Sequence, residues 1–129
     1  MHKHPNEERI AALYDHFAKG EFDAVLEMCS DDITFEVPGR TPFSGVHTKA
    51  EFEDWIGKVW AISEGTFREV PKRIVANDHH GVALLDHFLS RGGREIQYRT
   101  NHIWEIREGV FTHWEEWPGD EEIFTSAWS

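Results

Sequence analysis

The chain has 129 residues, of which 29% are charged and 13% are aromatic, and its formal net charge at pH 7 is −11. This length favours a single domain, residues 1–129, that can bury a core of its own. The negative charge argues against a nucleic acid or an anionic membrane as a partner, because both would repel the chain.

The first third of the sequence predicts two helices and a strand. Asn6 or a neighbour can cap a first helix, which Lys19-Gly20 ends. A short second helix is predicted over residues 22–29, and alternating apolar residues predict a strand over residues 33–37. The buried face of the first helix is expected to carry residues at helical spacing, namely Ile10, Leu13, Tyr14 and Phe17.

The middle of the chain predicts a loop and a third helix, and the remainder predicts strands. Proline and glycine over residues 38–45 exclude regular structure there, and a helix is expected to begin at His47-Thr48. Its apolar stripe consists of Phe52, Trp55, Ile56, Val59 and Trp60. Strands are predicted for the rest of the chain after Gly65, over residues 66–76, 82–90, 94–107 and 110–117. Helices followed by an antiparallel meander predict an α+β fold, with helices packed on one face of a curved sheet.

The strand over residues 94–107 is expected to have one apolar face and one polar face. Side chains alternate between faces with a period of two, so one face carries Ile96, Tyr98, Thr100, His102, Trp104 and Ile106. A face that only packs would rarely include a histidine. A tight Gly92-Gly93 turn would place His87 opposite Tyr98 on this inner face.

The turn that follows this strand decides which residues of the last strand share the inner face. A two-residue turn, Glu108-Gly109, requires a positive φ at Glu108, which is costly for a residue with a Cβ atom. It would turn His113, Glu115 and Trp117 inward, because a slip of one residue moves every side chain to the other face.

A three-residue turn over residues 107–109 requires a positive φ only of its glycine. It would pair His102 with Trp114 and direct Glu116 to the same face. We prefer this turn, so His102 and Glu116 are predicted to face the interior together.

An imidazole and a carboxylate on one buried face can move protons. The pKa of a histidine lies near neutrality, and a neighbouring carboxylate can tune it. Burial among tryptophans would raise the pKa of Glu116 and suit it to proton transfer, while Tyr98 and Tyr14 could donate hydrogen bonds to a carbonyl oxygen or its enolate. The alternative is ordinary packing, with a neutral core His102 and tyrosines whose hydroxyls are bonded locally.

Several segments of the chain follow one another in an order that resembles a known family. They are residues 22–39, residues 42–45 and the late sequence His102 … Gly109 … His113-Trp114-Glu115, and they are similar to SnoaL-like members of the nuclear transport factor two-like superfamily. The resemblance covers nearly the whole chain. It implies a cone-shaped α+β fold, in which three N-terminal helices pack on a strongly curved mixed, mainly antiparallel sheet and enclose a cavity. It also implies a homodimer through the outer sheet face.

The ketosteroid isomerase branch of this superfamily has an aspartate base at the end of its first strand, just before a proline. This chain has Val37 and Pro38 there, so the resemblance implies that this base is missing. The second carboxylic acid of that branch corresponds to His102, and its helix tyrosine falls near Tyr14. Limonene epoxide hydrolase, another branch, needs an Asp-Arg-Asp arrangement that these faces lack.

The polyketide cyclase branch has a histidine in the penultimate strand and an acidic residue fourteen positions later. His102 and Glu116 have this spacing, with glutamate in place of the usual aspartate. The resulting hypothesis is an enzyme without a cofactor, of the isomerase, cyclase or hydratase type, that acts on a small, largely apolar carbonyl compound. The alternative hypothesis is a non-catalytic ligand-binding or dimeric interaction module.

The candidate catalytic residues are therefore His102, Glu116, Tyr98 and Tyr14, and the candidate substrate-binding residues are His87, Trp104, Trp114, Val37, Phe17 and Trp60. We expect no metal, although His102, His87 and Glu116 could converge, because the chain lacks a motif such as His-Glu-x-x-His. The single Cys29 cannot form an internal disulfide, which favours a reducing cytoplasm, and no segment is long enough to span a bilayer.

Overall fold

The computed structural model describes residues 3–129. It has the helices α1 (Pro5–Ala18), α2 (Phe22–Glu27), α3 (Phe52–Ile62) and α4 (Glu121–Trp128), with a short 3₁₀-helix (Lys49–Glu51) before α3. The strands are β1 (Cys29–Val37), β2 (Gly45–Thr48), β3 (Arg68–Ala76), β4 (His80–Arg91), β5 (Arg94–Arg107) and β6 (Val110–Pro118). Within residues 3–129, no helix combines the length and the apolar character needed to cross a membrane.

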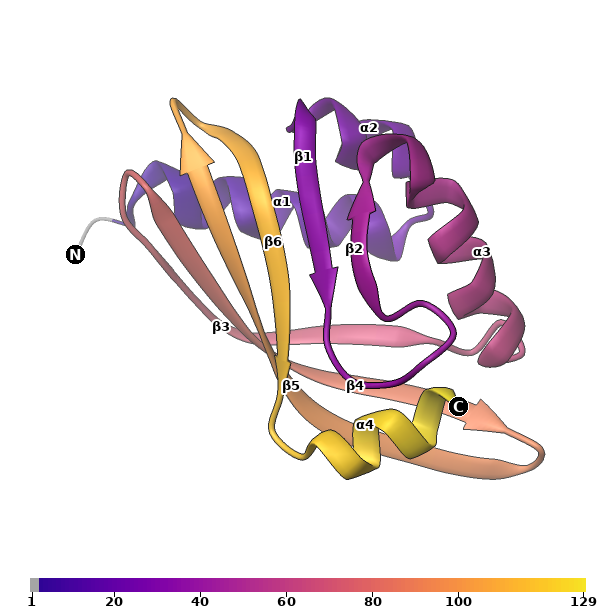
Figure 1. The fold of residues 1–129 in the computed structure, drawn as a ribbon. Helices are drawn as coiled ribbons and strands as arrows, with labels where there is room; N and C mark the ends of the chain where they lie inside the picture. Colours follow the sequence, from indigo (N-terminus) through magenta and orange to yellow (C-terminus); the bar gives the residue numbers. More distant parts are fainter. Residues whose placement is uncertain (1–2) are drawn as a thin grey trace.

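The six strands form one curved sheet in the order β2-β1-β6-β5-β4-β3. Strands β1 and β6 run parallel, and every other neighbouring pair is antiparallel. In Figure 1 the sheet bends so that β1 and β2 stand across the direction of β3, while α4 lies under the far end of the sheet near β5. Helices α1, α2 and α3 cover the hollow side, which confirms the predicted α+β fold with three N-terminal helices on a strongly curved sheet.

Helix α1 begins one turn earlier than its apolar stripe because two side chains cap it. The Nδ1 atom of His4 accepts a hydrogen bond from the Asn6 amide at 3.0 Å, and the Glu7 carboxylate accepts one from the His4 amide at 3.0 Å. The cap is therefore His4, a neighbour of the predicted Asn6. The Asn6 side chain instead donates to the Asn77 carbonyl at 2.9 Å, which ties α1 to the turn between β3 and β4.

Two predicted boundaries are wrong. The segment expected to start the third helix at His47-Thr48 is the edge strand β2, in which His47 lies opposite Phe35. The chain also ends in a helix, α4, rather than continuing as strands, and the Asp120 side chain caps it by accepting a hydrogen bond from the Ile123 amide at 3.0 Å. Strand β2 has four residues and α4 has eight, lengths over which periodicity carries little information.

The Gly92-Gly93 turn pairs β4 with β5 as predicted, with His87 opposite Tyr98. The predicted three-residue turn between β5 and β6 is wrong. The turn is the two-residue Glu108-Gly109, with φ of 50° and 78°. Both central residues have positive φ, which matches the twist of a tight hairpin. Glu108 therefore adopts the backbone conformation that is costly for a residue with a Cβ atom.

A β-bulge in β6 reverses the consequence of this turn. Ile106 lies opposite Phe111 and Glu105 lies opposite His113, so Thr112 is an extra residue in β6. The extra residue shifts the alternation of faces by one. Trp114 and Glu116 therefore point inward after all, and the partner of His102 across the ladder is Glu116 rather than Trp114.

Gly81 in β4 allows α1 to approach the sheet closely. A Cβ atom there would collide with Cδ1 of Ile10, a fully buried side chain that would have to shift within the core. Overpacking of this kind costs about 1–3 kcal/mol, so Gly81→Ala should lower the free energy of unfolding by that amount in urea titrations. The matched control is Gly57→Ala in α3, where nothing lies within 4 Å and the helix should gain about 0.5–1 kcal/mol. A Gly81→Ala protein as stable as the wild type would contradict this packing.

Candidate active site

A cavity lies between the helices and the hollow face of the sheet. The space open to the centres of water-sized molecules is about 70 Å³, which fits a few waters or part of a small ligand. Most of the wall is aromatic or aliphatic, and the carboxylates and imidazoles lie on the strands β3 to β6. Eight of the predicted site residues line this cavity: Tyr14, Phe17, His87, Tyr98, His102, Trp104, Trp114 and Glu116.

Two predicted substrate-binding residues lie outside the cavity wall. Val37 is buried at the end of β1, one pleat beyond Phe35, which does line the cavity. Trp60 is half-buried on α3 and stacks on Phe17, with ring centroids 6.4 Å apart. Both are core positions next to the cavity.

The first polar arm of the cavity runs from Trp104 to Glu116. The Trp104 indole donates a hydrogen bond to the Tyr14 hydroxyl at 3.2 Å, and that hydroxyl lies 2.6 Å from Nδ1 of His102. Nε2 of His102 lies 3.5 Å from Oε2 of Glu116, and the Thr100 hydroxyl donates to the same oxygen at 2.9 Å. The order of side chains is therefore Trp, Tyr, His and Glu.

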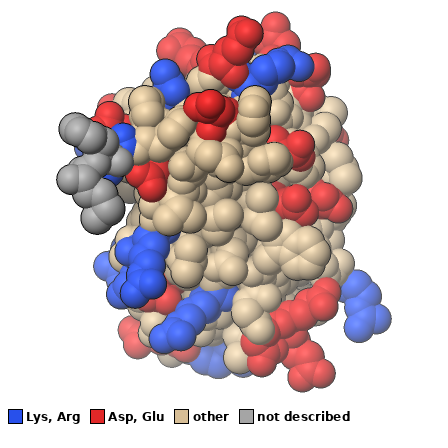
Figure 2. All heavy atoms as spheres, turned by 90° about the vertical axis from the view of Figure 1, so that its left-hand side faces the viewer, with Lys and Arg blue, Asp and Glu red and all other residues tan. Residues whose placement is uncertain are grey.

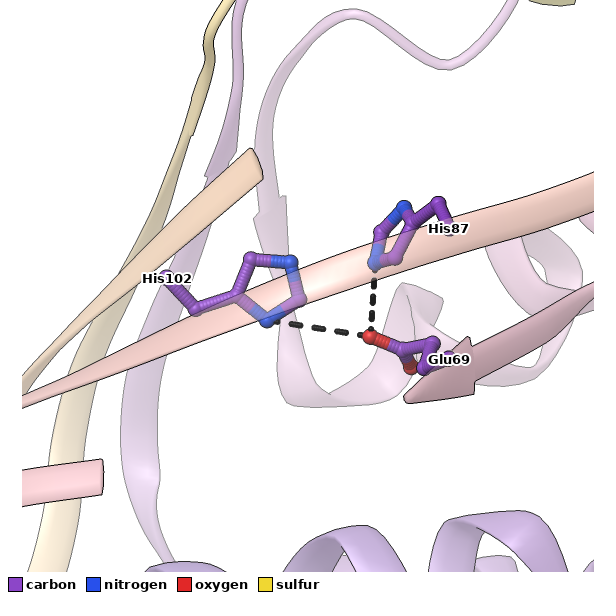
Figure 3. Close-up of side chains that lie close together, drawn as sticks. All are labelled: Glu69, His87 and His102. Atoms are coloured by element: carbon purple, nitrogen blue, oxygen red, sulfur yellow. Dashed lines mark hydrogen bonds and ion pairs between the residues drawn. The ribbon is translucent and has the colours of Figure 1, made fainter. Parts of the chain in front are cut away.

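A second polar arm repeats this order on the other side of the cavity. The Trp128 indole donates to the Tyr98 hydroxyl at 2.8 Å, and that hydroxyl lies 2.9 Å from Nδ1 of His87. Nε2 of His87 donates to Oε2 of Glu69 at 3.0 Å, because an ionised carboxylate can only accept. Figure 3 shows the Glu69 carboxylate reaching from β3 to both imidazoles.

The two arms are interleaved rather than separate. Oε2 of Glu69 lies 3.7 Å from Nδ1 of His102, and Oε2 of Glu116 lies 3.6 Å from Nδ1 of His87. The Glu69 side chain is 10% exposed, and the other three side chains are 4–6% exposed. Two carboxylates and two imidazoles thus share one nearly dry site, where charges interact more strongly than in water.

Glu69 is a carboxylate of the cavity that the sequence does not predict. It lies in β3, directly opposite His87 of β4. A register shift between Pro71 and Arg73 disrupts the alternation of β3, so counting residues along the strand does not place Glu69 on the inner face. Before the irregularity, Phe67, Glu69 and Pro71 lie at every second position, so the sequence indicates that Glu69 shares a face with Phe67.

Comparison with known proteins decides the family. A model of the SnoaL-like domain matches residues 10–114 of the chain. The protein belongs to the SnoaL-like family. This confirms the resemblance noted in the sequence. A search of curated proteins returned no match.

Solved structures agree with this SnoaL-like assignment at the level of the fold. Bal32a from a soil-derived mobile gene cassette superposes with a TM-score of 0.89 at 20% identity, over 96% of each chain. TerC, co-crystallised with polyporic acid, gives 0.85 at 20% identity, over 96% of this chain and 98% of its own. IdmH of Streptomyces antibioticus, a candidate polyketide cyclase, gives 0.77 at 14% identity, over 96% and 97% of the two chains.

The pKa of Glu116 in this SnoaL-like protein lies below its usual value, opposite to the sequence expectation. Burial alone would raise this pKa, as predicted. The contact with His102, the charge of His87 and the hydrogen bond from Thr100 together outweigh burial and lower it. Glu116 is therefore ionised at neutral pH and can accept a proton.

The pKa values of His87, Tyr14 and Tyr98 in this site lie above their usual values. Burial lowers the pKa of His87, but its hydrogen bond to Glu69 and the charges of Glu69 and Glu116 outweigh burial and raise it. Burial, with the charges of the same two carboxylates, raises the pKa of Tyr14 and of Tyr98 well above the usual range. Both hydroxyls remain hydrogen-bond donors at every physiological pH.

Two polar atoms of residues that line the cavity lack a partner in the described part of the chain, the indole nitrogen of Trp55 and Nε2 of His102. Nε2 of His102 is buried and makes no hydrogen bond with any residue of the described range 3–129. The Glu116 oxygen at 3.5 Å is too distant for a well-formed bond. A buried, unsatisfied nitrogen is costly, so a polar atom of a ligand or a water is expected to complete it.

The cavity also contains a group of side chains with the donor atoms of a metal site. The ligand atoms of Glu69, His87 and His102 lie within 4.8 Å of one another, close enough to hold a metal ion, but the same nitrogens already have hydrogen-bond partners in Glu69 and Tyr14. On the outer face, Glu36, His113 and Glu115 form a second such group. Burial raises the pKa of the Cys29 thiol to about 12, which makes it a poor nucleophile at neutral pH.

Proposed function

We propose that this SnoaL-like protein binds a small, largely apolar carbonyl compound in its cavity and catalyses proton transfer on it without a cofactor. The reaction is of the isomerase, cyclase or hydratase type, and His102 and Glu116 are its catalytic pair. The observation that carries the proposal is the unpartnered Nε2 of His102, which lies beside an ionised carboxylate in an apolar cavity. Membership of the SnoaL-like family supports a ligand-binding or cyclase-type role.

The proposed mechanism uses Glu116 as the base. Its carboxylate removes a proton from the carbon next to the carbonyl group, and the electrons of the C–H bond move toward the carbonyl oxygen. In this mechanism the Tyr14 hydroxyl, 2.6 Å from Nδ1 of His102, is the donor of that hydrogen bond. A neutral His102 then carries its hydrogen on Nε2 and can donate it to the developing enolate. Return of the proton to another atom gives isomerisation, and attack of the enolate on a second carbonyl gives cyclisation.

Two of the similar structures are consistent with such a ligand. IdmH is described as a candidate polyketide cyclase, and TerC was co-crystallised with polyporic acid. The wall of the cavity suits flat, conjugated compounds, because many of its side chains are aromatic, among them Trp55 and Trp114. We therefore expect an aryl or polyketide-like ketone rather than an aliphatic sugar or a phosphate.

The test is exchange of the acidic C–H protons of phenylacetone and of small β-dicarbonyl compounds in D₂O, followed by proton NMR. The wild type should accelerate exchange above the rate in buffer, and His102→Asn should reduce that acceleration by about 10²-fold or more. Binding of the probes without any acceleration would remove the catalytic proposal and leave a ligand-binding module. Wild-type rates in His102→Asn would remove the role of His102.

A dimeric interaction module is the second candidate function. Leu84, Asn101 and Trp117 lie side by side across three strands on the outer sheet face, and Trp117 is 58% exposed. Figure 2, which views the molecule from the left-hand side of Figure 1, shows an uncharged area bordered by acidic and basic groups. We propose that two chains form a homodimer through the outer sheet face. We also propose a cytoplasmic location, because the single cysteine cannot form an internal disulfide. Sedimentation velocity should give twice the 15.0 kDa mass of the chain, and a monomer at all concentrations would remove the dimer.

A further inference from the structure

We propose that Glu69, His87 and Tyr98 form a second proton relay, which supplies a proton to the carbonyl oxygen while Glu116 removes one from the neighbouring carbon. The inference rests on the proposed function and deepens it. It assigns a role to Glu69 and orients the substrate, an enolisable ketone, with its oxygen at Tyr98 and its acidic C–H at Glu116.

The direction of the hydrogen bonds distinguishes the two arms. In the second arm, Nε2 of His87 must donate to Glu69, and the Trp128 indole must donate to the Tyr98 oxygen. When His87 carries its second proton, Nδ1 also donates to Tyr98 at 2.9 Å. The Tyr98 oxygen then accepts two hydrogen bonds, and its own hydrogen is free to point at a ligand in the cavity.

The charged and titratable groups around His87 favour this protonated form. Glu69 of β3 lies 3.0 Å from Nε2, and Glu116 of β6 lies 3.6 Å from Nδ1. Asp86 precedes His87 in β4, and the remaining neighbours are the Tyr98 hydroxyl and the imidazole of His102, with ring centroids 5.3 Å apart. Carboxylates from two strands thus face one imidazole, which is consistent with its raised pKa.

The proton transfers balance without another reactant. Glu116 takes the proton from carbon, the C–H electrons form a C=C bond, and the carbonyl π electrons move to oxygen. The oxygen takes the Tyr98 proton, and Nδ1 of His87 replaces that proton on Tyr98. The products are an enol, a neutral Glu116 and a neutral His87. Because Oε2 of Glu116 lies 3.6 Å from Nδ1 of His87, the proton can return directly and reset the pair.

Glu69 is a positioning residue in this scheme, so its test is a pH profile. The rate at which the wild type exchanges the C–H protons of phenylacetone should fall as the pH rises through the pKa of His87. His87 then loses the proton that it supplies to Tyr98. Glu69→Gln keeps the size of the side chain and removes the charge that stabilises the imidazolium. The alkaline limb should move at least about one pH unit lower, which reduces the rate above that limb about tenfold.

Asp86→Asn is the matched control. Asp86 is adjacent to His87 in β4 but turns to the other face, where it lies 3.7 Å from Lys72. The charge of Asp86 contributes less to the raised pKa of His87 than the contacts with Glu69 do, so the alkaline limb of Asp86→Asn should move less than that of Glu69→Gln. Identical pH profiles for Glu69→Gln and the wild type would overturn the relay, and so would a Tyr98→Phe protein that exchanges at the wild-type rate.

A measurement on the wild type keeps the relay testable if the variants fail to fold. In ¹⁵N NMR at pH 7, both ring nitrogens of His87 should carry protons, and a neutral His87 would overturn the inference. Lack of exchange with every ketone in the wild type would remove the proposed function. The protonation state of His87, measured by NMR, would then show separately whether its imidazole carries a second proton beside Glu69 and Glu116.

Discussion

Replacing Glu116 with glutamine should lower the rate of C–H exchange at pH 7 by about 10²–10⁴-fold, the usual contribution of a general base. Glutamine has nearly the same shape and can still accept the hydrogen bond that the Thr100 hydroxyl donates at 2.9 Å. It cannot take a proton from carbon. The variant should therefore fold as the wild type does, which circular dichroism can confirm, and lose most of its activity.

Glu115→Gln provides the control on the same strand. Glu115 lies on the outer face of β6, where its carboxylate accepts a hydrogen bond from the Trp117 indole at 3.0 Å. Its substitution should change the exchange rate by no more than about twofold, as expected for a surface change. If Glu116→Gln kept a rate within this range, the carboxylate facing the cavity would not be the base.

The β-rich part of the fold was predictable because its signals are local. Residues 94–107 alternate between a mostly apolar inner face and a mostly polar outer face, and they form β5 with the predicted bounds. Tight glycine turns then fix the pairing of β4 with β5. The strand β2 and the helix α4 gave no such signal, since both are short and owe their structure to contacts with distant residues, such as Phe43 packed against Trp128.

The candidate site was less predictable because it depends on two irregularities. Glu116 was assigned to the inner face through a turn that the protein does not have, and the bulge at Thr112 restores the same parity. Glu69 was missed because β3 contains a second irregularity. A bulge leaves no reliable mark in one sequence, since its stability comes from the strands on either side.

The pKa of Glu116 shows the same dependence on distant residues. The tryptophans near it in sequence suggested desolvation, which alone would raise the pKa. The opposing contributions come first from the contact with His102 of β5, then from the charge of His87 of β4 and the hydrogen bond from Thr100. The sign of a shift in a buried cluster depends on every neighbour, so it follows only from the assembled structure.

Replacing Trp114 with alanine should lower the free energy of unfolding by about 3–5 kcal/mol, as other large-to-small changes of aromatic core residues do. Trp114 is 5% exposed. It packs between Phe35 of β1 and Trp55 of α3, with ring centroids 6.1 Å and 5.3 Å away. Its removal would leave a cavity that joins the existing one. Urea titrations followed by circular dichroism measure the loss.

Trp117→Ala tests whether the bulge sets the inner face of β6. The two tryptophans lie three residues apart, so a regular strand places them on opposite faces, and the position of the bulge decides which one is buried. Trp117 is exposed, and its removal should change the free energy of unfolding by no more than about 0.5 kcal/mol. Repeating both titrations at tenfold lower protein concentration separates self-association through the outer face from monomer stability. A larger loss for Trp117→Ala than for Trp114→Ala in the monomer would mean that β6 presents its other face to the core, with Glu115 rather than Glu116 in the cavity.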